Sequence, residues 1–479
     1  MKLREYAAFD GLGLADLIRG REVTPRELGR CVMDAVAAVN PRINAVIELY
    51  EDAIAALGDR PGPAPFHGLP TLTKDFPIEN GRPAEFGSVF ARGFKAGYDH
   101  AFWRKLRAGG LGNVGRTTTS EFGLAAATES SLYGATRNPW DPARGVAGSS
   151  GGAAAATAAG IVPFAQGADG GGSIRNPASF CGLVGLKPSR GRVSGAPESN
   201  APLLGLATAF MLTRSIRDAA ALLDLASGAV AGDGYEIAPP GSSYVRAIET
   251  PPQRLRIALC TTSWSGYPIE AEVKATVEDL GRRLEQLGHV VTEAGPQFPY
   301  EPYLDAQKVI WAAFTAQSLD ELSGLLHRPI DETGLQQTTL AVYRYGKTLD
   351  AARLIAALAT YDQITRTVGE FLAQFDVLLT PTSPASPETV GTYDPDRSGR
   401  TIDTVFEDLA PKETFTALFN ATGQPAVSLP LGVTSSGLPI GVQLAAAFGR
   451  ENVLLRLGAV LEAEYAWGRR RPPVHAADG

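Results

Sequence analysis

The chain has 479 residues, of which 44% are hydrophobic, and its formal net charge is −7. This length fits one large domain or two, and the apolar content is ample for a buried core. The acidic balance provides no basic surface for nucleic acid. The three widely spaced cysteines, Cys31, Cys181 and Cys260, predict neither a disulfide framework nor a zinc site.

No segment of the sequence predicts export or a membrane span. The opening MKLREYAAFDGLGLADLIRG lacks the apolar core of a signal peptide. The longest uncharged stretch, Gly145 to Ala168, consists mainly of glycine, serine and alanine and contains Pro163, unlike a membrane helix. We therefore expect a soluble, cytoplasmic protein that does not bind a membrane.

In chain order, the first clear element is an amphipathic helix over 24–40, in which Thr24 is the N-cap and Glu27 completes a capping box. Further helices are predicted over 99–110, which a glycine ends, and over 272–288. Strands are predicted for the short apolar segments 70–74, 161–167, 254–260, 375–381, 425–430 and 439–444. Strands that alternate with helices indicate an α/β fold with a mainly parallel central sheet.

The region 300–370 is predicted to be mostly helical, and it carries the aromatic residues Trp311, Phe314, Tyr343 and Tyr345. These helices could cap the sheet, and their rings would then line a pocket. Ordinary packing between helices is the simpler explanation for any single ring. If the region caps the site, we expect all four rings to line the acyl pocket.

Two familiar motifs lack the context that their chemistry needs. GLGNVG at 110–115 matches a dinucleotide-binding fingerprint, but it follows a predicted helix and leads into an extended segment. GSSGG at 148–152 has Ser150 at the centre of a nucleophile-elbow pattern, yet the preceding RNPWDPARGVA predicts a loop, not a strand. None of the five histidines has a recognisable catalytic setting. A Ser-His-Asp esterase is a poorly supported alternative.

Two other stretches could carry chemistry. A predicted strand ends at Asp169, and three glycines then precede Ser173. Consecutive glycines can turn backbone N–H groups toward one point, where they bind an anion or a developing oxyanion. A plain strand-to-helix turn or a phosphate loop explains this stretch equally well. Lys74 ends another apolar strand, and by itself it is more simply a surface residue than a buried base.

Together these stretches resemble the amidase signature family. The matching segments are GLPTLTKD (68–75), GATRNPWDPARGVAGSSGGAAAA (134–156), GADGGGSIRNPASFCGLVGLKPSRGRVS (167–194) and FNATGQPAVSLPLGVTSSGLPIGVQL (419–444). Within that family, the chain is most similar to the group of 6-aminohexanoate cyclic-dimer hydrolases and aryl acylamidases. The resemblance implies a single domain over 1–479, built on a large mixed central β-sheet surrounded by helices, with a helical cap-like region near 300–370.

The resemblance also implies an activity and its residues. Ser173 corresponds to the nucleophile, Ser149 to the serine that follows a cis peptide bond, and Lys74 to the base. The oxyanion hole corresponds to the amides of Gly170, Gly171, Gly172 and Ser173, and Ser150 corresponds to a supporting residue. The implied reaction is hydrolysis of C–N bonds in small amides through an acyl-enzyme on Ser173, with anilides, carbamates and esters as related substrates. It needs neither a metal nor an organic cofactor, and a homodimer is a common assembly for such enzymes.

The chain departs from the family pattern at Ala147, Ala168 and Thr118, none of which is a triad residue. The amidase subunit of glutamine-dependent tRNA amidotransferases is an alternative within the family. That subunit carries a glutamine where this chain has Asn176, and an acidic residue that the segment 205–215 lacks. A non-enzymatic scaffold would be expected to lose a triad residue, and a nucleotide-binding protein would depend on GLGNVG alone.

Two expectations concern charge in the site. The uncharged segment 205–212 predicts a pocket for neutral, apolar acyl groups, and we expect Arg175 to pair with Asp169 instead of binding a substrate carboxylate. Lys74 must be uncharged to act as a base, so its apolar strand should desolvate the amine. Because successive side chains on a strand face opposite ways, Asp75 should point away from it.

Overall fold

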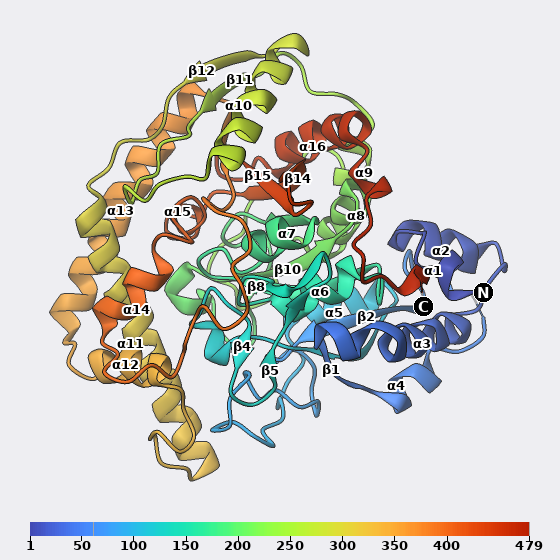
Figure 1. Ribbon diagram of the computed structural model, residues 1–479, viewed down its shortest axis with the longest axis horizontal. Coiled ribbons are helices and arrows are strands. Elements are labelled where there is room, and N and C mark those ends of the chain that lie inside the picture. The colour runs from blue at the N-terminus through green and yellow to red at the C-terminus, as the bar shows by residue number, and fades with distance from the viewer. Residues whose placement is uncertain (61, 479) are drawn as a thin grey trace.

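A large mixed β-sheet forms the centre of the protein in the computed structural model, which describes residues 1–60 and 62–478 (Figure 1). The sheet has eleven strands. In spatial order they are β1 (Val46–Leu49), β3 (Leu111–Thr117), β2 (Leu69–Lys74), β8 (Phe164–Asp169), β10 (Thr208–Thr213), β9 (Val184–Lys187), β14 (Ala426–Val433), β15 (Pro439–Ala445), β13 (Val377–Pro381), β11 (Arg256–Leu259) and β12 (Val290–Glu293).

The direction of the strands corrects the expectation of a mainly parallel sheet and agrees with a mixed one. Only β2–β3, β2–β8, β11–β12 and β11–β13 are parallel pairs among the described residues. The middle of the sheet, from β8 through β10, β9, β14 and β15 to β13, is antiparallel. The neighbours β14 and β15 are joined by a short turn, which can only connect antiparallel strands.

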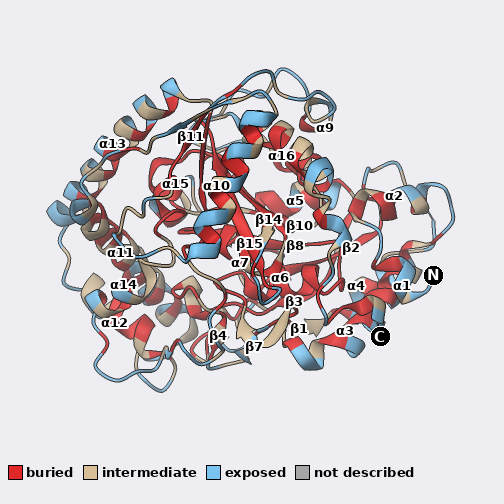
Figure 2. Cartoon of the chain, turned by 45° about the horizontal axis from the view of Figure 1, so that its top comes forward, coloured by how far each residue is buried: buried red, intermediate tan, exposed pale blue. Residues whose placement is uncertain are grey.

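Helices cover the sheet, and the burial of the chain follows this layering, with the exposed sides of α10 and α13 facing solvent (Figure 2). The helices are α1 (Leu3–Tyr6), α2 (Gly11–Arg19), α3 (Pro25–Ile43), α4 (Glu51–Ala56), α5 (Ala101–Ala108), α6 (Gly151–Ala158), α7 (Arg175–Cys181), α8 (Ile216–Ala226), α9 (Tyr244–Ala247), α10 (Ala271–Gln286), α11 (Tyr300–Leu326), α12 (Gln337–Gly346), α13 (Ala351–Gln374), α14 (Ile402–Leu409), α15 (Ala417–Thr422) and α16 (Glu451–Tyr465). None of the helices in the described ranges is long and apolar enough to cross a membrane.

Most predicted elements are present with shifted ends. The predicted N-cap Thr24 accepts a hydrogen bond from the Glu27 backbone N–H, which closes the capping box of α3. The segment GLGNVG follows α5 and enters β3, so the order of elements opposes a dinucleotide fingerprint. One local prediction is wrong: RNPWDPARGVA contains the small hairpin β6 (Arg137–Asn138) and β7 (Asp141–Gly145), outside the central sheet.

The helix α6 can pack closely on its neighbours, because it is built from glycine, alanine and one threonine, all of them buried. A Cβ added to Gly152 would lie 2.5 Å from the backbone nitrogen of Thr118. Only glycine allows this approach, so the helix packs directly against the chain that follows β3. The loop that leads into α6 is thereby held beside the ends of β2 and β8, where the candidate catalytic residues lie.

Candidate active site

Lys74 is the last residue of β2, whose six residues are all buried. Its Nζ donates a hydrogen bond to Ser149 Oγ over 2.6 Å and a longer one to Ser150 Oγ over 3.2 Å. The ring of Phe76 lies 4.5 Å from the same nitrogen. Burial removes water from the amine and lowers the pKa of Lys74 to about 7, although the charges of Asp169 and Asp75 oppose this shift. A lysine with this pKa is partly neutral at neutral pH and can accept a proton.

Asp75 points away from the lysine, as the alternation of the strand predicts. Its carboxylate accepts hydrogen bonds from the backbone N–H groups of Glu85 and Gly87, over 2.8 and 2.9 Å. Arg116 Nη1 donates to the same carboxylate over 2.7 Å. Asp75 therefore has its own cation, and it does not hold Lys74 in the charged form by direct contact.

Ser149 follows a cis peptide bond from Gly148, at the end of the loop before α6. Its neighbour Ser150 is fully buried, and the Ser150 hydroxyl bonds to both the N–H and the carbonyl of Ala168 in β8. Ser150 thus joins the loop to the sheet and does not face the cavity described below, whereas Ser149 does. This geometry does not fit Ser150 as a nucleophile.

Ser173 lies in the turn between β8 and α7, after Gly170, Gly171 and Gly172. Gly172 has a φ of 141°, and a Cβ there would lie 2.3 Å from Thr416 Oγ1. Side chains are excluded from this turn by both conformation and space. Within residues 1–60 and 62–478, the backbone N–H groups of Gly171, Gly172 and Ser173 donate no hydrogen bond. These donors are free to bind an oxyanion.

The start of α7 is fixed by a buried ion pair between Asp169 and Arg175, as the sequence predicts. Arg175 Nη2 and Nε donate to the two carboxylate oxygens of Asp169 over 2.8 and 3.0 Å, and neither side chain is exposed. The C-terminal part of the chain completes the network, because Arg175 also donates to Asn420 Oδ1 and to Gln443 Oε1. The charged and amide groups of this network form hydrogen bonds with one another, so the network holds the glycine turn in place without leaving a buried charge unpaired.

The structure brings Lys74, Ser149 and Ser173 to the wall of one cavity. Ser173 is 5% exposed and Ser149 is 2% exposed, so both are reached only through this cavity. Within the described part of the chain, which includes both serines, no hydrogen bond joins Ser149 Oγ to Ser173 Oγ. The backbone N–H of Ser150 does donate a hydrogen bond to the Ser173 carbonyl over 3.2 Å. The contact from lysine to serine is formed, and the contact between the two serines is not.

The cavity has a volume of about 510 Å³ and mostly apolar walls. The expectation that four aromatic residues of region 300–370 line it is half right. Trp311 and Phe314 of α11 form part of the wall, but Tyr343 and Tyr345 do not. Tyr343 instead donates a hydrogen bond to Asp320. The expectation of uncharged walls near residue 205 is correct, because Leu203, Ala207, Thr208 and Ala209 line the cavity.

Sequence reasoning missed several residues of the site. Gln166 Oε1 accepts the backbone N–H of Lys74 over 2.9 Å and so aligns the end of β2 with β8. His100 lines the cavity, where its Nδ1 accepts the Phe102 N–H and burial lowers its pKa to about 4. The carboxyl of Glu413 packs behind the glycine turn, where a Cβ on Gly171 would lie 2.4 Å from it. No local motif marks these positions, because each comes from a separate part of the chain.

Comparisons with known proteins agree with this geometry. The model of the Amidase family matches residues 27–455. The 6-aminohexanoate-cyclic-dimer hydrolase of Paenarthrobacter ureafaciens is 36% identical in an alignment 479 positions long, which covers 97% of this chain and 96% of that protein. A solved structure of 6-aminohexanoate cyclic dimer hydrolase complexed with substrate has a TM-score of 0.92 at 34% identity, covering 98% of this chain and 99% of that one.

A bacterial aryl acylamidase of the amidase signature family shares the fold, with a TM-score of 0.85 at 23% identity over 97% of this chain and 99% of that one. The family match and the 6-aminohexanoate-cyclic-dimer hydrolase each extend over most of the chain. They agree with the motifs around Lys74, Ser149 and Ser173. The chain therefore belongs to the amidase family and is a hydrolase of amide carbon–nitrogen bonds.

Proposed function

We propose that this amidase cleaves small amides through an acyl-enzyme on Ser173, with Ser149 and Lys74 as the proton relay. The observation that carries the proposal is the 2.6 Å contact between Lys74 Nζ and Ser149 Oγ in a cavity that Ser173 also lines. A desolvated lysine in contact with a serine is a base that can remove a proton from it.

In this mechanism, neutral Lys74 accepts the proton of Ser149, and Ser149 accepts the proton of Ser173 as the two hydroxyls approach. Ser173 Oγ attacks the carbonyl carbon, and the free amides of Gly171, Gly172 and Ser173, together with that of Gly170, stabilise the oxyanion. Ser149 then returns a proton to the leaving nitrogen, and the C–N bond breaks. A water molecule then gives a proton to Ser149 and attacks the acyl carbonyl carbon. The ester bond to Ser173 Oγ breaks, Ser149 returns the proton to Ser173, and the acid is released.

We infer that the substrates are small amides with an apolar acyl part, including linear and cyclic amides and anilides, because the wall formed by the described residues is mostly apolar and carries no arginine. Carbamates and esters use the same acyl transfer and belong to the same range. Cyclic amides deserve first testing because a 36% identical relative is a 6-aminohexanoate-cyclic-dimer hydrolase. A single domain, a cytoplasmic location and a homodimer remain predictions.

The alternative of a glutamine amidotransferase subunit is less well supported by the cavity. Glutamine carries an α-carboxylate, which proteins recognise with arginine. No arginine lies on the described wall, and Arg175 is occupied by Asp169, Asn420 and Gln443. The first experiment is therefore a panel of linear amides, cyclic amides, anilides, carbamates, esters and glutamine with the purified protein. Turnover of glutamine alone would overturn the proposed substrate range.

A further inference from the structure

Negatively charged side chains outnumber positively charged ones on the described cavity wall. The charged groups are Lys74 at the catalytic end and two carboxylates, Glu198 and Glu321, both of which are exposed. His100 adds no positive charge, because burial lowers its pKa to about 4. Once Lys74 is neutral, the formal charge of the wall is wholly negative.

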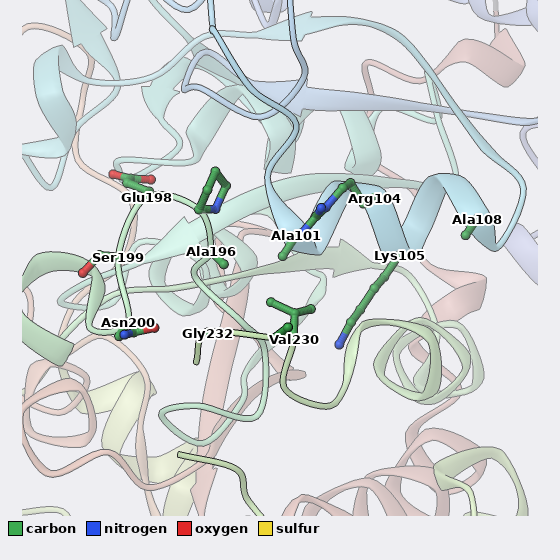
Figure 3. A pocket seen from close by; sticks show the side chains of 12 residues that line it. Ala101, Arg104, Lys105, Ala108, Ala196, Glu198, Ser199, Asn200, Val230 and Gly232 are labelled. Carbon is green, nitrogen blue, oxygen red and sulfur yellow. The ribbon is translucent and has the colours of Figure 1, made fainter. Parts of the chain in front are cut away.

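Glu198 lines the catalytic cavity and also a second hollow of about 830 Å³, whose wall includes the whole segment 196–200 (Figure 3). The nearby cations line that second hollow. Arg104 and Lys105 belong to α5, and Lys105 Nζ donates to the carbonyl of Ser227 over 2.8 Å. In Figure 3 the Glu198 carboxylate lies well apart from both side chains. Within the described chain it forms no ion pair with a lysine, arginine or histidine.

Glu198 has an aromatic neighbour on the cavity wall. Burial, together with the charge of the nearby Glu198 carboxylate, raises the pKa of the Tyr98 hydroxyl, and both residues line the cavity. Water reaches the Glu198 side chain, but the surrounding protein restricts its hydration, and this desolvation raises the pKa of Glu198 above its usual value. A carboxylate with restricted hydration and no cation beside it binds an external cation more strongly than a freely hydrated one does.

The two ends of the cavity differ in depth. Lys74 and Ser149 are 1% and 2% exposed, whereas Glu198 is exposed and also reaches the second hollow. The rest of the wall is largely hydrocarbon and includes Trp311 and Leu322 of α11. A matching ligand has an amide for the serines, an apolar chain for the walls, and a cation at the solvent end.

We propose that Glu198 and Tyr98 form a subsite for a protonated primary amine, so that the preferred substrates are amides whose chain ends in an ammonium group. This inference rests on the proposed function of the serines and lysine, and it names the substrate class of that site. The ammonium donates to the Glu198 carboxylate, while the chain between the two ends packs on the apolar wall. A terminal carboxylate is disfavoured, because it meets Glu198 and Glu321 without a compensating cation.

The test measures binding apart from turnover. Straight-chain alkylammonium ions and the alkanols of equal length are titrated calorimetrically into the Ser173→Ala variant. We expect the ammonium ion to bind about three- to tenfold more tightly than the alkanol, the range of a partly desolvated charge-assisted contact. Glu198→Gln should remove this preference and leave alkanol binding unchanged. Equal binding of both ligand types by the Ser173→Ala parent would overturn the subsite.

Two controls make the assignment specific. Glu321→Gln removes the other carboxylate of the wall and should keep most of the ammonium preference; an equal loss would mean a diffuse negative potential, and the subsite would be wrong. Tyr98→Phe removes the hydroxyl that lies beside Glu198 on the cavity wall and should reduce the preference partly.

Turnover separates this inference from the proposed function. Anilides with amine-terminated, methyl-terminated and carboxylate-terminated acyl chains are compared on wild type and on Glu198→Gln. Hydrolysis of all three with no advantage for the amine contradicts the subsite and leaves the amidase mechanism intact. Preferred binding of ammonium without hydrolysis of any amide contradicts the mechanism and leaves the subsite intact.

Discussion

Lys74 and Asp75 are neighbours in sequence with opposite electrostatic surroundings. Among the described residues, the amine of Lys74 donates hydrogen bonds only to serine hydroxyls, and burial lowers its pKa to about 7. The carboxylate of Asp75 is paired with Arg116 over 2.7 Å on the other side of the strand. One strand thus separates a charge that supports structure from an amine that can serve as a base.

The nucleophile can be identified by covalent labelling. A fluorophosphonate or sulfonyl fluoride should modify the peptide that contains Ser173, because this serine follows the free N–H groups of the glycine turn and faces the cavity. Mass spectrometry of the digested protein identifies the site. Modification of Ser150 would contradict the assignment, since Ser150 is buried and bonded to Ala168.

The glycine turn should tolerate no side chain at its centre. Gly172→Ala combines a φ of 141° with a Cβ only 2.3 Å from Thr416 Oγ1. We expect amide turnover to fall about 100-fold, the loss typical of a displaced oxyanion donor, and stability to fall by about 1–3 kcal/mol. Gly437→Ala is the control: its φ is 86°, but no atom of the described residues lies within 4 Å of the added Cβ. It should lose some stability and keep its activity.

Trp311 should contribute to the apolar acyl pocket next to the oxyanion loop. A Cβ on Gly170 would lie 3.2 Å from the indole of Trp311, so the ring covers this part of the turn. Trp311→Ala should lower kcat/KM for apolar anilides about tenfold, mainly through KM. Tyr343→Phe, in the same helical region but outside the cavity wall, should have no effect. Equal effects of the two substitutions would argue against a pocket at Trp311.

Glu413 should produce a loss of activity at alkaline pH. Its carboxyl lies against Gly171, and desolvation, with the nearby charge of Asp169, raises the pKa of Glu413 to about 8. Below that pH the group is neutral; above it, a negative charge stands behind the developing oxyanion and opposes it. We expect kcat/KM to fall above about pH 8 in wild type and to stay level in Glu413→Gln. A falling limb that persists in Glu413→Gln would contradict this role.

Prediction from sequence succeeded where the signal is local and failed where the fold sets the neighbours. The glycines before Ser173 and the paired serines at 149–150 mark their own turns, and Lys74 ends a recognisable apolar strand. The order and direction of strands could not be derived, because short apolar segments carry no information on their partners. Tyr343 was misplaced because the face that a helix turns to the cavity depends on α11 and its packing. Glu198 and Glu413 join the site only through the fold.

Lys74 as the general base is the central claim, and one measurement tests it most directly. The amide kcat/KM of wild type, Lys74→Ala and Lys74→Arg is measured across about pH 6 to 10, within which a lysine of pKa about 7 titrates and an arginine does not. Wild-type activity should rise with pH through an apparent pKa near 7, up to the decline above about pH 8 predicted for Glu413, because only the deprotonated amine accepts the Ser149 proton. Both variants should be inactive on amides at every pH, and esters should be less affected, since their leaving group needs little protonation. Near-wild-type turnover of amides by Lys74→Arg would mean that Lys74 is a structural cation, and the proton relay would be wrong.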